Sequence, residues 1–197
     1  MAGCDTRAVG PDLALRYFRA VSDLPHDRRA ALADLEACFL DAETPGRIDG
    51  ATSGRLIATT LGFGLDGLVG GIRRLWMPWL GKSFDPESKD GRNIFSSSFR
   101  PIRRLLWPSV ELDHPAGPGR FTTFPFTTWE GPSAFGQGAA DVLKIDYEHP
   151  QSPWLIRDIL DELVQLDEGL FLGQALLRIR GDLHRVAWFE LRGSPGD

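Results

Sequence analysis

A few charged residues interrupt apolar runs of this chain, and they are its candidates for chemistry. Arginine dominates the basic residues. Of the three lysines, Lys82 and Lys144 lie in strand-like apolar surroundings. The carboxylates Asp161 and Glu162 lie in the apolar run at 155–163. A buried charge has to be paired or hydrogen-bonded, so we expect such groups to meet in the interior.

Few partners are available for a buried carboxylate in this chain. They are Lys82, Lys144, Asn93 and Tyr147. We predict that at least one of Lys82, Lys144 and Asp161 is buried and hydrogen-bonded to another member of this set or to Tyr147. The six tryptophans supply large apolar side chains, either as core or as the wall of a ligand site.

The apolar spacing at 155–163 predicts a helix that starts at Ser152-Pro153. Adjacent residues on a helix point about 100° apart. Asp161 and Glu162 then cannot both share the apolar stripe, so we expect one of them to be solvated. The alternative is an ordinary exposed acidic pair near a helix end.

One motif has the form of a nucleotide-binding loop. Residues 62–67 match G-x-G-x-x-G, follow an expected strand at 56–60 and open an expected helix at 65–76. A dinucleotide-binding fold also needs successive strand–helix–strand crossovers, whereas the downstream sequence predicts mostly strands joined by turns. We therefore interpret the motif as a glycine-permitted turn before a helix.

Other reaction centres have no matching pattern. The four histidines are not spaced as metal ligands, either from one another or from the two cysteines. No serine lies in a G-x-S-x-G elbow. We expect neither a metal nor any other cofactor.

The composition favours a cytoplasmic protein that does not bind nucleic acid. The chain has 197 residues and a formal net charge of -5, whereas phosphate binding needs a basic face. Arg100, Arg103 and Arg104 are interpreted as a solvated or ion-paired group. No run approaches the ~18 apolar residues of a membrane span, and two cysteines make no disulfide framework. The oligomeric state is not indicated.

Hydrophobic periodicity divides the chain into three parts. Residues 1–44 form an N-terminal helical segment, in which a break at Leu24-Pro25 predicts two helices. Residues 45–192 form the expected β-barrel domain, and residues 193–197 form a flexible tail. The expected strands cover 48–60, 81–95, 121–129, 142–147, 170–180 and 185–192.

Several short blocks occur in the order typical of one family. They are Gly54 after Asp49-Gly50, the block 79–85, Lys144 to Tyr147, Asp161 to Leu163, Leu172-Gly173 and the block 188–191. Over about residues 46–192 the chain resembles small bacterial domains of the GXWXG type with their companion C-terminal domain of unknown function. It departs from them at 50–54, which lacks the tryptophan, and in the reversed order of Asp146 and Tyr147. The resemblance implies a calycin-like, lipocalin-like barrel of no assigned activity.

The sequence therefore predicts a mainly β fold. We expect a lipocalin-like antiparallel barrel of about eight strands, with an N-terminal helical cover and two inserted helices. One of its strands is expected at 79–84, with Lys82, Leu80 and Phe84 on one face.

The expected function is binding of a small, largely apolar molecule in the barrel cavity. The candidate ligand-binding residues are Trp79, Lys82, Phe84, Asn93, Lys144, Tyr147 and Asp161. One alternative is an enzyme of isomerase or cyclase type that uses a shifted carboxylate or Lys82 as general acid or base. Another is a structural or partner-binding protein whose cavity is filled by its own side chains.

Overall fold

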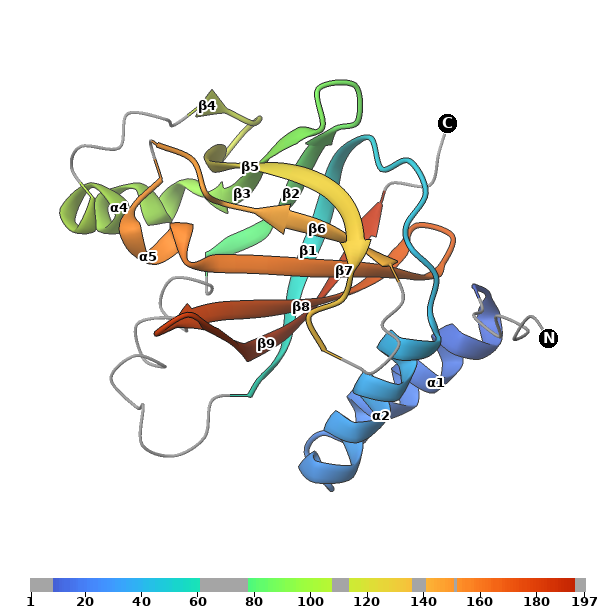
Figure 1. The fold of residues 1–197 in the computed structure, drawn as a ribbon. Coiled ribbons are helices and arrows are strands. Elements are labelled where there is room, and N and C mark those ends of the chain that lie inside the picture. The colour runs from blue at the N-terminus through green and yellow to red at the C-terminus, as the bar shows by residue number, and fades with distance from the viewer. Residues whose placement is uncertain (1–8, 61–77, 108–113, 136–140, 151, 194–197) are drawn as a thin grey trace.

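The computed structural model describes residues 9–60, 78–107, 114–135, 141–150 and 152–193. The nine described strands form one antiparallel sheet, and eight of them close into a barrel (Figure 1). These eight are β1 (Gly50–Thr59), β2 (Trp79–Asp85), β3 (Asp90–Ser96), β5 (Arg120–Pro132), β6 (Asp141–Asp146), β7 (Ile159–Asp167), β8 (Leu170–Ile179) and β9 (Asp182–Gly193).

The strand order is β3-β2-β1-β9-β8-β7-β6-β5, and pairing of β3 with β5 closes the barrel. The two-residue strand β4 (His114–Pro115) pairs with the start of β5. The predicted antiparallel β-barrel is therefore confirmed. Alternation along the strands separates two apolar clusters: in β8, Phe171 and Ala175 belong to the barrel interior, whereas Leu170 and Leu172 belong to an outer cluster.

The expected helix at 155–163 is wrong beyond its first turn. Only α5 (Trp154–Arg157) is helical, and the chain then enters β7. One face of β7 contributes to the inner cluster and the other to the outer cluster. A strand buried on both faces is apolar at nearly every position, so its sequence also satisfies helical spacing. Asp161 and Glu162 therefore point to opposite faces of a strand, and both are buried rather than one being solvated.

The two expected N-terminal helices are confirmed as α1 (Pro11–Asp23) and α2 (Arg28–Asp41). Asp27 caps α2 by accepting a first-turn backbone N–H at 3.0 Å. Both helices lie against the outside of the barrel (Figure 1), where they share the outer cluster with β7, β8 and β9. Tyr17 anchors α1 by donating its hydroxyl proton to Glu190 of β9 at 2.5 Å.

Two short helices, η1 (Ser97–Phe99) and α4 (Arg100–Leu106), follow β3. On α4, Arg103 is buried and donates to the carbonyl oxygen of Trp107 at 3.3 Å. The expected helix at 65–76 and its glycine motif lie outside the described residues. In the described part of the chain, no helix has the length and apolarity needed to cross a membrane.

Candidate ligand-binding site

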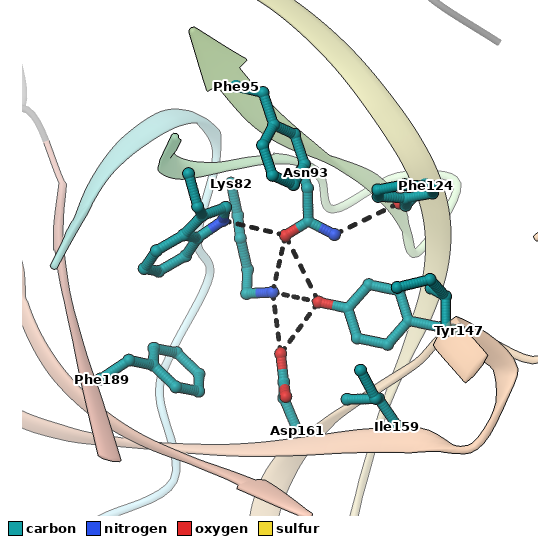
Figure 2. Close-up of a pocket in the computed structure, with 10 residues that line it drawn as sticks. Lys82, Asn93, Phe95, Phe124, Tyr147, Ile159, Asp161 and Phe189 are labelled. Carbon is teal, nitrogen blue, oxygen red and sulfur yellow. Dashed lines mark hydrogen bonds and ion pairs between the residues drawn. The ribbon is translucent and has the colours of Figure 1, made fainter. Parts of the chain in front are cut away.

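A cavity of about 40 Å³ lies within the inner cluster of the barrel (Figure 2). Its polar wall consists of Lys82 from β2, Asn93 from β3, Tyr147 just after β6 and Asp161 from β7. Its other walls are the side chains of Trp79, Phe95, Phe124, Ile156, Ile159 and Phe189. Residues far apart in the sequence therefore form one compact polar cluster in apolar surroundings.

A bulge in β2 turns both Trp79 and Lys82 toward this cavity. The pairing of β2 with β3 shifts between Trp79 and Gly81, which interrupts the alternation of faces. Gly81 permits this shape, since its φ is 143° and an added Cβ would lie 1.9 Å from the carbonyl oxygen of Thr52. The expected strand is confirmed, but Trp79 rather than Leu80 lines the cavity beside Lys82.

The ammonium group of Lys82 has one acceptor for each of its three protons. Nζ donates to Asn93 Oδ1 at 3.0 Å, to Asp161 Oδ2 at 2.8 Å and to the hydroxyl oxygen of Tyr147. Lys82 is 1% exposed and Asp161 is 2% exposed. The prediction that one of Lys82, Lys144 and Asp161 is buried and hydrogen-bonded within its set is therefore confirmed.

Asn93 is oriented by contacts at both ends of its amide. Its Oδ1 also accepts the indole N–H of Trp79 at 3.1 Å, and its Nδ2 donates to the carbonyl oxygen of Phe124 at 3.4 Å. Phe124 has a φ of 51°, which is rare for an aromatic residue, and it lies at a register shift between β3 and β5. Backbone strain at Phe124 thus accompanies the placement of the carbonyl that holds Asn93.

Four aromatic rings surround the ammonium group of Lys82. Their centroids lie 4.9 Å (Tyr147), 5.2 Å (Phe126), 5.5 Å (Phe189) and 5.6 Å (Trp79) from Nζ. Ring faces attract a cation, most strongly where water is excluded. The cluster therefore holds a charge that has aromatic neighbours in addition to its three acceptors.

Glycines make room for three of these rings against the barrel wall. A Cβ added at each glycine would lie far too close to the neighbouring ring. The shortest distances are 2.4 Å from Gly54 to Trp79, 2.2 Å from Gly91 to Phe126 and 2.1 Å from Gly173 to Phe189. Any larger residue at these positions would have to displace a ring from beside Lys82. The glycines of the strands are thus part of the site's construction.

Burial changes the proton affinities within the cluster. Desolvation lowers the pKa of Lys82, and the charge and hydrogen bond of Asp161 oppose that shift. Desolvation, followed by the charge of Asp161, raises the pKa of Tyr147 well above its ordinary value. The phenol of Tyr147 is therefore protonated at neutral pH and acts as a hydrogen-bond donor.

One carboxylate oxygen of the cluster has no partner among the described residues. Asp161 Oδ2 accepts from Lys82 and, at 2.9 Å, from the hydroxyl of Tyr147, whereas Oδ1 is buried without a hydrogen bond. Leaving a buried acceptor unsatisfied costs roughly 1–3 kcal/mol. Asp161 lines the cavity, so the unpaired oxygen belongs to a residue of the cavity wall.

Two of the expected site residues do not line this cavity. Lys144 forms an ion pair of 2.7 Å with Glu162, on the face of β7 opposite Asp161. Glu162 also accepts hydrogen bonds from Ser133, Ala134 and Gln174. Phe84 is buried against Phe126 within the inner cluster. The structure thus brings together five of the seven expected residues.

Most of the apolar wall is absent from the residues expected from the sequence. The absent residues are Phe95, Phe124, Ile156, Ile159 and Phe189. Phe95 and Phe189 lie in expected strands, so strand alternation is the pattern that indicates them. Phe124 also lies in an expected strand, but a bulge there interrupts the alternation. Ile159 is expected in a helix but lies in β7, which changes the direction of its side chain, whereas Ile156 lies in α5 as expected.

Among the residues with described positions, no group of histidine, cysteine and carboxylate side chains could hold a metal ion.

The fold and site together define a closed antiparallel barrel with a buried lysine–aspartate pair at its internal cavity. No family model, curated protein or solved structure matches the chain. The resemblance to GXWXG-type domains therefore stays a prediction.

Proposed function

We propose that this protein binds a compact, mostly apolar molecule inside its barrel, with the cluster of Lys82 and Asp161 holding the polar end. The observation that carries the proposal is Asp161 Oδ1, a buried acceptor without a partner among the described residues at the wall of a cavity. A ligand O–H or N–H would donate to Oδ1. The apolar part of the ligand would pack against Phe124 and Ile159.

The cavity limits the size of this ligand. Its volume of about 40 Å³ holds roughly three water-sized groups, because one water needs about 10–15 Å³ of such space. Drug-sized sites are larger, at roughly 300–1,000 Å³. The ligand is therefore a small molecule, or the narrow end of a longer one. Small-ligand binding inside a closed barrel fits the proposed lipocalin-like relationship, and the cytoplasmic location stays a prediction.

Two measurements test the proposal. Native mass spectrometry detects a ligand retained during purification, and NMR detects binding of propanamide, which combines an N–H donor with a short apolar tail. We expect propanamide to shift the indole N–H of Trp79 and the methyl groups of Ile156 and Ile159, which line the cavity.

Variants separate cavity binding from surface binding. Lys144→Met leaves the cavity lining unchanged, so it should bind propanamide like the native protein. The double variant Lys82→Met/Asp161→Leu removes the buried ion pair of the cluster, including the unpaired oxygen of Asp161, and should lose the response. A native protein that carries no ligand and does not respond to propanamide, or a double variant that responds equally, would reject the proposal. A native protein without a ligand and without a response to propanamide would favour a barrel filled by its own side chains.

A further inference from the structure

We propose that Lys82 reacts covalently with the ligand, its Nζ condensing with the carbonyl carbon of a compact aldehyde or ketone to form an imine. This inference rests on the proposed function, because the carbonyl compound would occupy the same cavity. It adds a substrate class and a bond-forming step, neither of which binding alone requires.

The position of Lys82 suits a nucleophile. Its side chain forms part of the cavity wall, and Asn93, Tyr147 and Asp161 hold its nitrogen from three directions (Figure 2). Imine formation requires a free amine. The apolar surroundings favour that form, since desolvation lowers the pKa of Lys82.

Asp161 is placed to receive the proton that Lys82 has to lose. Its Oδ2 lies 2.8 Å from Nζ, so a single transfer along this hydrogen bond converts the ion pair into a neutral amine and a neutral acid. The net charge of the buried cluster does not change. A solvent-exposed lysine gains no such advantage, because water stabilises its charge.

The following steps pass two protons of Nζ in turn through Asp161 to the carbonyl oxygen. The lone pair of Nζ forms the bond to carbon while the C=O π pair moves to oxygen, and the oxygen takes up the proton that Asp161 received from Nζ. The nitrogen then returns a proton to Asp161, and the hydroxyl group takes that proton and leaves as water while C=N forms. One ammonium group and one carbonyl compound give one protonated imine and one water, without oxidant or reductant.

Two features of the cluster serve this sequence. Tyr147 donates to Asp161 Oδ2 and accepts from Lys82 Nζ, so its hydroxyl lies between the groups that exchange protons. Asp161 Oδ1 is free of protein donors in the described structure and would accept the hydroxyl of the addition intermediate or the released water. The protonated imine keeps its positive charge beside the carboxylate, as Lys82 does.

The test is reductive trapping at neutral pH. The protein is incubated with propanal and sodium cyanoborohydride, and peptide mass mapping locates and times the N-propyl groups. Lys89, in the exposed turn between β2 and β3, is the internal reference. We expect Lys82 to be modified faster than Lys89, because the lowered pKa of Lys82 raises its free-amine fraction at neutral pH and the cavity holds the aldehyde beside its Nζ. Tyr147→Phe should slow the labelling of Lys82, and Lys89→Arg should leave it unchanged.

The outcomes separate the two proposals. If Lys82 is unmodified, or is modified no faster than Lys89, imine formation is rejected. If propanamide still shifts the signals of Trp79, Ile156 and Ile159 in that case, the binding function stands without the covalent step. If neither trapping nor binding is observed, both proposals fail.

Discussion

Removing one partner of the buried Lys82–Asp161 pair should destabilise the barrel more than removing both. At their separation of 2.8 Å, Coulomb's law gives about 6 kcal/mol of attraction for an effective dielectric constant of about 20. Burying each ion costs several kcal/mol, so the pair is worth little more than two apolar residues. Lys82→Met and Asp161→Leu should each cost about 3–5 kcal/mol, because each leaves a buried charge unpaired. The double variant should lie within about 2 kcal/mol of the native protein.

Urea unfolding followed by tryptophan fluorescence measures these differences, provided that the m-values agree among the variants. Lys144→Met is the matched control. Glu162 keeps its hydrogen bonds from Ser133, Ala134 and Gln174 in this variant, so the loss should be smaller than for Lys82→Met. Single variants that cost less than about 1 kcal/mol, or a double variant as unstable as the sum of the singles, would refute the reasoning.

Gly173→Ala should lower the melting temperature, since its Cβ would lie 2.1 Å from the ring of Phe189, whereas Gly131→Ala, with its nearest neighbour at 3.6 Å, should change it little in the same scan. Between the lowered pKa of Lys82 and its ordinary value of 10.5, the unfolded chain binds more protons than the folded protein. The contribution of Lys82 to the free energy of unfolding should therefore rise with pH in this window. Urea unfolding of the native protein and of Lys82→Met at several pH values measures this contribution. A difference in unfolding free energy that does not change with pH would contradict the lowered pKa. Tyr17→Phe removes the hydroxyl that donates to Glu190 of β9 and should lower the free energy of unfolding by roughly 1 kcal/mol. Amide hydrogen exchange should then become faster in α1 more than in β8. Equal changes in both elements would argue that Tyr17 does not anchor α1.

Most barrel strands could be predicted from the sequence, because turn residues separate runs with a solvated or mixed face. β7 could not be predicted in this way. On its outward face, Val164 and Leu166 belong to the cluster shared with the N-terminal helices instead of contacting water. Glu162 is the only charged residue on that face, so the regular polar positions that mark a strand's second face are missing. Periodicity alone does not distinguish such a strand from a buried helix.

The polar residues of the site could be predicted, because a lysine or aspartate in an apolar run needs a partner. Their pairing could not. In the sheet, Lys144 lies opposite Glu162 and Ile145 lies opposite Asp161. A shift of one residue in this register would exchange the faces of every side chain, and the sequence does not specify the register. The bulges at Gly81 and Phe124 depend on pairing in the same way.

Two adjacent carboxylates of β7 give the strongest argument that the inner cluster has a function beyond stability. Glu162 faces outward and accepts four hydrogen bonds, two on each oxygen, so its site is complete without a ligand. Asp161 faces the cavity and accepts its hydrogen bonds on Oδ2, while Oδ1 is unpaired among the described residues. The same strand, with the same burial on both faces, can therefore satisfy a carboxylate fully. The unsatisfied oxygen belongs to a side chain of the cavity wall, which is the arrangement expected when a ligand supplies the missing donor.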